Sequence, residues 1–110
     1  MAGPERKVKD MIKKRLKDIG AWYDMPVPGG FGKSTLDFIV CYKGVFFAIE
    51  AKAPGKQATP RQQLTMQEIE QAGGFAWVVS DSESLEVAIT SMKIIVSSEK
   101  ITFGKSTVWQ

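Results

Sequence analysis

The chain has 110 residues, of which 44% are hydrophobic, and a net charge of +3, which together fit one globular domain with a modest core. It holds no histidine, which excludes Ser-His-Asp triads, HNH-type nucleases and His-ligated zinc, and its single cysteine excludes an internal disulfide or a cysteine zinc cluster. Any catalysis must therefore use carboxylates, lysines or a metal ion.

The sequence predicts a cytoplasmic protein with no membrane partner. No stretch is apolar for long enough to span a bilayer, and the charged N-terminal residues lack the hydrophobic segment of a signal peptide. The low cysteine content is consistent with a reducing compartment.

Residues 4–19 predict an amphipathic helix that ends at Gly20. Its apolar residues recur at helical spacing: Val8, Met11, Ile12, Leu16 and Ile19. The first 20 residues carry seven basic and three acidic side chains, so the outer face of the helix is basic. Such a face could run along a phosphate backbone or simply keep the helix soluble, and the sequence leaves both interpretations open.

A glycine-rich loop follows, at residues 26–35. Gly32, Lys33, Ser34 and Thr35 imitate the end of a Walker A phosphate loop, but Val27 stands where its first glycine should be. The next residues read as a strand and not as the helix that would hold a phosphate. We therefore expect no nucleotide cofactor. The loop could approach a nucleic-acid backbone or be an ordinary connection.

Two apolar, β-prone runs, residues 36–41 and 45–51, predict a pair of antiparallel strands. Lys43 and Gly44 suit a two-residue loop between them, which would pair Tyr42 with Val45. A three-residue loop with Gly44 in a bulge would instead move the register by one residue. We expect Cys41, inside the first run, to be a small core residue.

Three charged residues, Asp37, Glu50 and Lys52, interrupt these runs. With the two-residue loop, Asp37 lies directly opposite Glu50, and Lys52 shares their face because side chains alternate along a strand. With the three-residue loop, the two carboxylates would lie on opposite faces. In the first case the other face offers a core surface of Leu36, Phe38, Val40, Val45, Phe47 and Ile49.

The predicted pairing of two carboxylates favours a metal site. Neighbouring carboxylates repel each other unless a cation or a proton lies between them. Hard oxygen ligands suit Mg²⁺ or Mn²⁺, and such an ion polarises a phosphoryl oxygen and lowers the pKa of a bound water. Lys52 would orient or deprotonate that water, or stabilise charge on the phosphorus. The alternative is a solvated edge hairpin whose charges are simply exposed.

Thr59 and Pro60 predict the start of a helix that runs to Ala72 and is ended by Gly73 and Gly74. Residues 75–80 predict a buried strand, and Ser82 begins a third helix. Residues 101–103 and 107–109 are candidates for short strands. The inward residues of the two helices should be Leu64, Thr65, Met66 and Ile69, and then Leu85, Ala88, Ile89 and Met92.

With one short strand between the first helix and the two site strands, the order is α-β-β-β-α-β-α, which predicts an α/β fold with a mixed β-sheet flanked by helices. In this order the chain resembles the viral replication and repair nuclease domain, VRR-NUC, of the PD-(D/E)XK superfamily. The similarity runs from Glu5 to Asp81 and includes DFIV at 37–40, AIEAKAPG at 48–55, TPRQ at 59–62 and AGG at 72–74. It implies one VRR-NUC-like domain over residues 1–110, with a restriction-endonuclease-like core.

The resemblance implies a metal-dependent phosphodiesterase. In that family pattern Asp37, Glu50 and the backbone carbonyl of Ala51 bind the ion, and Lys52 activates the water or stabilises charge. Gln62 supports the site from the following helix. Glu5 adds a carboxylate from the first helix.

One position departs from the family pattern, because Leu36 stands where a proline usually precedes the metal-binding aspartate. We expect an altered loop shape there and retained metal binding. The candidate residues for nucleic-acid contacts are Lys33, Ser34, Lys56 and Arg61.

Small stand-alone members of this family look like homodimeric enzymes, of phages or their bacterial hosts, that resolve four-way DNA junctions. The resemblance therefore implies a homodimer, branched DNA as the substrate, and Mg²⁺ or Mn²⁺ as the cofactor. Approximate two-fold symmetry of the junction fits a pair of equivalent sites. Two alternatives stay open: a nuclease of this fold that acts on flaps, nicked duplex or RNA, and a non-catalytic DNA-binding module.

Overall fold

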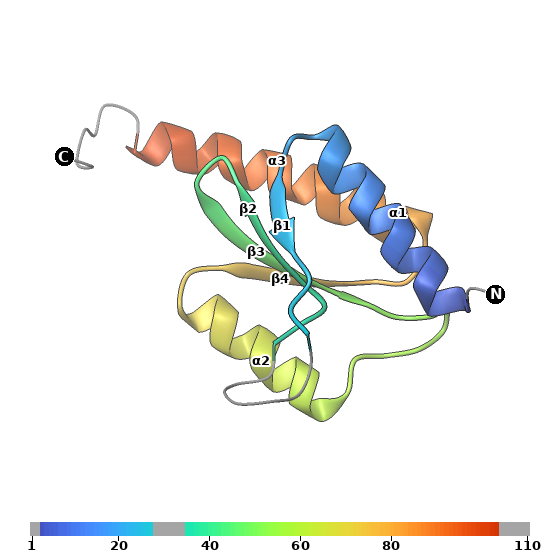
Figure 1. The fold of residues 1–110 in the computed structure, drawn as a ribbon. Coiled ribbons are helices and arrows are strands. Elements are labelled where there is room, and N and C mark those ends of the chain that lie inside the picture. The colour runs from blue at the N-terminus through green and yellow to red at the C-terminus, as the bar shows by residue number, and fades with distance from the viewer. Residues whose placement is uncertain (1–2, 28–34, 104–110) are drawn as a thin grey trace.

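The computed structural model describes residues 3–27 and 35–103 as a four-stranded mixed sheet with helices on both faces (Figure 1). The predicted order α-β-β-β-α-β-α is confirmed. The strands lie in the order β1-β2-β3-β4, antiparallel except for the parallel pair β3 and β4. The elements are α1 (Pro4–Asp18), β1 (Trp22–Asp24), β2 (Phe38–Tyr42), β3 (Val45–Ala51), α2 (Pro60–Gln71), β4 (Phe75–Val79) and α3 (Ser82–Phe103).

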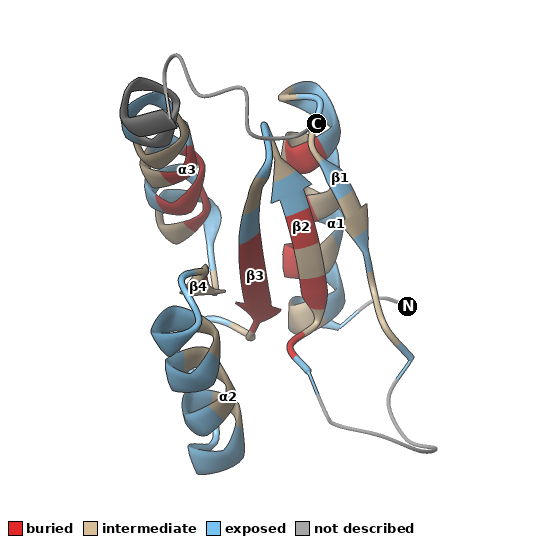
Figure 2. Cartoon of the chain, turned by 90° about the vertical axis from the view of Figure 1, so that its left-hand side faces the viewer, coloured by how far each residue is buried: buried red, intermediate tan, exposed pale blue. Residues whose placement is uncertain are grey.

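Helices α1 and α3 cover one face of the sheet and enclose the main core, with the buried positions turned toward the sheet (Figure 2). In α1 the fully buried residues are Val8, Ile12 and Leu16, each one turn after the last, as the sequence predicts. All four predicted inward residues of α3 are buried: Leu85, Ala88, Ile89 and Met92. In the part of the chain that is described, no helix is long and apolar enough to cross a membrane.

The hairpin of β2 and β3 has the two-residue loop. Tyr42 pairs with Val45, and Phe38 pairs with Ile49. The two loop residues have positive φ, 53° at Lys43 and 86° at Gly44, which a type I′ turn requires. The register that brings Asp37 opposite Glu50 is therefore confirmed, one position beyond the last paired residues of the ladder.

Helix α2 covers the opposite face, over β3 and β4, and closes a second, smaller core. This core contains Leu36, which the sequence places on the face of Phe38. The prediction is wrong because β2 begins only at Phe38 and Asp37 lies in a bend, so the strand alternation does not extend back to Leu36. The remaining members are Ala48, Ala76, Met66 and Ile69.

Two further residues that the sequence predicts to be inside, Cys41 and Leu64, are exposed. Cys41 is exposed, because it lies on β2 whereas α2 packs over β3 and β4. Leu64 is 56% exposed, on the outer side of α2.

Gly74, between α2 and β4, lets the backbone pass close to β3, since a Cβ there would lie 3.0 Å from Cδ2 of Phe46.

The end of the chain also differs from the prediction. Residues 101–103 belong to α3 and form no strand, because the helical run that starts at Ser82 continues through them. Residues 107–109 lie outside the part of the chain that is described.

Candidate active site

Asp37 and Glu50 are joined by crossed hydrogen bonds at the end of the β2–β3 ladder. The backbone N–H of Asp37 donates to Oε1 of Glu50 at 3.1 Å. The backbone N–H of Ala51 donates to Oδ2 of Asp37 at 3.0 Å. Each carboxylate is thus held by the backbone of the other strand, so the hairpin register and the geometry of the pair depend on each other.

Glu50 is only 4% exposed. Its burial first, and then the charge of Asp37, raise the pKa of Glu50 from the ordinary 4.5 to about 7. The hydrogen bond from the Asp37 backbone and the charge of Lys52 oppose this rise. Nζ of Lys52 lies 3.8 Å from Oε2 of Glu50, and the Lys52 side chain is 15% exposed. The predicted Asp37, Glu50 and Lys52 therefore lie together at one end of the sheet.

Gln62 joins this group from the first turn of α2. Its Nε2 donates to Oε2 of Glu50 at 2.8 Å, while its Oε1 accepts from the backbone N–H of Thr59 at 2.9 Å. The hydroxyl of Thr59 in turn accepts from the backbone N–H of Gln62, which completes a capping box. One amide side chain thus fixes the start of α2 and the orientation of Glu50.

Lys9 of α1 contacts the carboxylate of Asp37, although no sequence motif marks Lys9 as a site residue. Nζ of Lys9 lies 3.9 Å from Oδ1 of Asp37 and 3.4 Å from Oε2 of Glu5. Glu5 therefore meets the site through Lys9. The spacing of Glu5 and Lys9, four residues apart, predicts their ion pair, but only the docking of α1 brings Lys9 to Asp37.

Comparisons with known proteins bear on the fold. No protein-family model matches the sequence, and no curated protein matches it significantly. A solved structure described as a VRR_NUC domain matches with a TM-score of 0.70 and 21% sequence identity, over 81% of this chain and 97% of that one. The chain has the fold of a VRR_NUC domain. The predicted α/β fold, a mixed sheet flanked by helices, is thus confirmed.

Within this VRR_NUC fold, the candidate DNA-contacting residues fall into two groups. Lys56, in the turn after β3, and Arg61, in the first turn of α2, are both exposed. Lys33 and Ser34 lie outside the described residues. Ala51 is buried at the end of β3, and the role of its carbonyl oxygen stays a prediction.

The carboxylate oxygens of Asp37 and Glu50 fit a hard divalent cation. Two carboxylates converge, and the described part of the chain contains no group of three His, Cys, Asp or Glu that could hold a metal by itself. An ion at Asp37 and Glu50 would need further oxygen ligands from the backbone, water or a phosphate. Mg²⁺ and Mn²⁺ accept such a set, because they bind through one or two carboxylates and keep several waters.

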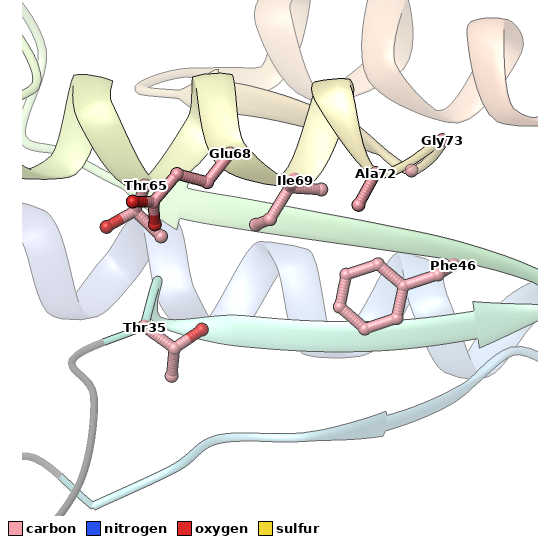
Figure 3. A pocket seen from close by; sticks show the side chains of 8 residues that line it. Thr35, Phe46, Thr65, Glu68, Ile69, Ala72 and Gly73 are labelled. Atoms are coloured by element: carbon pink, nitrogen blue, oxygen red, sulfur yellow. The ribbon is translucent and has the colours of Figure 1, made fainter.

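A pocket of about 470 Å³ lies between α2 and the sheet (Figure 3). Its walls include Thr35, Thr65, Ile69 and Phe46. Neither Asp37 nor Glu50 lines it, so the pocket and the candidate active site are separate features. Among the described residues that line the pocket, Glu68 is the one charged residue, so no two charged groups meet there.

Proposed function

We propose that the protein is a Mg²⁺- or Mn²⁺-dependent, structure-selective DNA endonuclease that acts as a homodimer and resolves four-way junctions. The observation that carries the proposal is the crossed Asp37–Glu50 pair with Lys52 beside it. The VRR_NUC fold supports the choice of phosphodiester hydrolysis over other metal-assisted chemistry. Residues 1–110 would then form a single nuclease domain.

In the proposed mechanism each residue has a distinct task. Asp37, Glu50 and the carbonyl oxygen of Ala51 would hold the ion, which would supply Lewis-acid polarisation of the phosphate and a more acidic water. Lys52 would orient or deprotonate that water, or stabilise the negative charge that develops on the phosphoryl oxygens. Gln62 fixes the Glu50 carboxylate for this task, since its amide donates to Oε2.

Substrate recognition would rest on the shape of the DNA backbone. The candidate contacts Lys33, Ser34, Lys56 and Arg61 are groups that bind phosphate oxygens and carry no information about base sequence. A four-way junction has approximate two-fold symmetry, so a dimer with equivalent sites can cut two opposed strands. Glu5 contributes a carboxylate at the edge of the site, through its contact with Lys9.

Cleavage of labelled DNA tests this proposal. The substrates are a synthetic four-way junction, a flap, a nicked duplex, a single strand and an RNA duplex, each with Mg²⁺, Mn²⁺ or EDTA. We expect metal-dependent cutting of the junction, and at least a 100-fold loss of rate in Asp37→Asn and Lys52→Ala. Asp24→Asn and Lys93→Ala are the matched controls, because both residues are exposed and lie outside the site. Circular dichroism verifies that all four variants fold.

Three results would contradict the proposal in different ways. Preference for the flap, nicked duplex or RNA would replace the junction as the substrate but keep the nuclease. Cutting that survives Asp37→Asn would remove the assigned site. Metal-independent binding of branched DNA without any cutting would identify a non-catalytic DNA-binding module.

A further inference from the structure

A lysine that the proposed mechanism leaves unused lies beside Asp37. Lys9 is in the second turn of α1, next to the buried Val8, so the packing of the helix fixes where its side chain begins. Its ammonium lies between two carboxylates, 3.4 Å from Glu5 and 3.9 Å from Asp37, and the side chain is 27% exposed. Lys9 is therefore placed to act on the same carboxylate that the metal ion needs.

The two oxygens of Asp37 have different surroundings. Oδ2 accepts the hydrogen bond from the Ala51 backbone, while Oδ1 is the oxygen that Lys9 approaches. Oδ1 is therefore the oxygen that a cation can bind without sharing it with the Ala51 N–H, and Lys9 lies on that side. Two positive charges repel in a partly buried site, so a divalent ion at Oδ1 would weaken the contact of the Lys9 ammonium with that same oxygen.

We propose that Lys9 is a displaceable counter-ion of the active site. In the metal-free protein its ammonium neutralises Asp37 and Glu5 and competes with the divalent cation. When the cation binds, Lys9 moves to a phosphate of the DNA. The inference rests on the proposed function, because it assumes that Asp37 binds a metal ion and that the substrate is DNA.

The geometry allows this exchange. Lysine carries its charge on a flexible four-carbon chain, so the ammonium can move several ångströms without any change in α1. Glu5 is 47% exposed and lies one turn earlier than Lys9, near the N-terminus of α1. A DNA phosphate near that end would give the displaced ammonium a new partner. Metal and DNA would then each strengthen the binding of the other by the same factor.

Calorimetric titration of Mn²⁺ into the full chain, without DNA, tests the competition. Lys9→Met keeps the length of the side chain and removes the charge, so we expect Mn²⁺ to bind three- to tenfold more tightly. Lys9→Arg keeps a cation and should stay within twofold of wild type. Lys14→Met is the matched control, because it removes one charge from an exposed position of the same helix. It should also stay within twofold.

The coupling to DNA is measured with a four-way junction whose phosphorothioate linkages resist cutting. In the wild type this junction should tighten Mn²⁺ binding at least fivefold. In Lys9→Met the tightening should be at least threefold smaller, because no ammonium moves from Asp37 to a phosphate. Equal tightening in both proteins would contradict the transfer of Lys9 to the DNA.

A measurement on the wild-type protein avoids dependence on the folding of a variant. With ¹³C-labelled lysine, the Cε resonance of Lys9 should shift during a Mg²⁺ titration, while that of Lys14 stays unchanged. An unchanged Lys9 resonance at saturating Mg²⁺ would overturn the proposal. So would a Lys9→Met protein that binds Mn²⁺ no more tightly than wild type, which is the result expected of a merely structural surface ion pair.

Asp37→Asn separates this inference from the proposed function. If the wild type binds Mn²⁺, Asp37→Asn does not, and Lys9→Met matches wild type, only the counter-ion role of Lys9 fails. If wild type and Asp37→Asn are alike in Mn²⁺ binding, the metal site itself fails and the role of Lys9 fails with it.

Discussion

Glu50 is both buried and acidic, and it is held by groups from three segments of the chain. It accepts hydrogen bonds from the Asp37 backbone and the Gln62 amide, and it lies near Lys52. Two of these three groups are neutral donors that stabilise the ionised carboxylate, yet burial and the charge of Asp37 still hold its pKa near 7. In the metal-free protein the ionisation of Glu50 is therefore shifted toward neutral pH.

This raised pKa gives the stability of the metal-free protein a definite pH dependence. The folded state holds the proton of Glu50 up to about pH 7, whereas an unfolded chain releases it near 4.5. The resulting stabilisation is fully present below pH 4.5 and is lost as the pH rises through 7. Relative to Glu50→Gln, the wild type should lose about 1 to 3 kcal/mol of unfolding free energy between pH 5 and pH 8.

Urea unfolding in EDTA at the two pH values measures this difference. Glu50→Gln is the appropriate reference, because its amide stays neutral at both pH values. Its single carbonyl oxygen can accept only one of the two hydrogen bonds, so the pH dependence of the two proteins is compared and not their absolute stability. Parallel pH profiles for the two proteins would show that Glu50 does not titrate with a raised pKa.

At the level of single residues, the sequence predicts the pairs that follow from strand geometry and misses those that follow from helix docking. Asp37 and Glu50 can be paired because a two-residue loop and strand alternation determine which residues face each other. Lys9 cannot be assigned in this way. Its position at Asp37 depends on how α1 lies across the sheet, which no local pattern specifies.

The first turn of α2 connects the stability of an element to the geometry of the site. Thr59→Ala removes the hydroxyl that caps the helix, which should cost about 1 kcal/mol of unfolding free energy. It should also weaken Mn²⁺ binding two- to fivefold, because the Gln62 side chain loses part of the structure that orients it toward Glu50.

Asp81→Ala provides the control for this prediction. Asp81 caps α3, where its Oδ1 accepts from the backbone N–H of Ser84 at 2.7 Å. The variant should lose comparable stability and keep wild-type Mn²⁺ affinity, as measured by urea unfolding and calorimetry. If both variants bind Mn²⁺ as the wild type does, the cap does not position Gln62.

The turn between β2 and β3 offers a second prediction at the scale of an element. Lys43 has a φ of 53°, which a lysine adopts less readily than an asparagine does. Lys43→Asn should therefore stabilise the protein by up to about 1 kcal/mol and leave Mn²⁺ binding unchanged. Gly44→Val should destabilise it by about 1 to 3 kcal/mol, because a β-branched residue is strained at this positive φ.

Thermal and urea unfolding of both variants measure these effects. Loss of stability in Lys43→Asn would indicate that the contact of the lysine with the Tyr42 ring, at 6.0 Å, outweighs the backbone preference. The turn matters beyond stability, since its length determines whether Asp37 and Glu50 share a face.

The helices and strands were predicted well where periodicity and caps agree, but the exposure of residues around α2 was predicted poorly. The sequence gives α2 within one residue of its end, but it places Leu64 inside and Cys41 in the core. The two errors have different causes. Leu64 lies on the outer side of α2, whereas Cys41 lies on a part of the sheet that α2 does not cover, and the extent of that cover depends on packing between distant segments.

Over the whole molecule, the candidate site combines residues from α1, β2, β3 and α2, whereas α3 supports it from a distance. Arg15 of α1 makes a two-point hydrogen bond with Glu86 of α3, at 2.6 and 2.9 Å. This link and the shared core hold α1 in place, and with it Lys9 and Glu5. The order of elements was predictable from the sequence, but this arrangement of helices required the three-dimensional structure.

The proposed homodimer makes a prediction about the products of cutting a supercoiled plasmid that carries an extruded cruciform. The first cut releases the supercoiling, and the cruciform is then reabsorbed. A second cut can follow only while the protein is still bound. A dimer with two sites should therefore produce linear DNA directly, whereas a monomer should accumulate nicked circles.

Mixing the wild type with a tenfold excess of inactive Asp37→Asn tests this at the scale of the assembly. Most active subunits would then share a dimer with an inactive partner, so we expect nicked circles to replace linear product while the wild type is still present at the same concentration. An excess of Asp24→Asn, which keeps its site, should preserve the linear product. Sedimentation at the assay concentration gives the subunit number independently. If the linear fraction stays unchanged with excess Asp37→Asn, cutting by paired subunits is contradicted. Only within a dimer can an inactive subunit prevent the second cut.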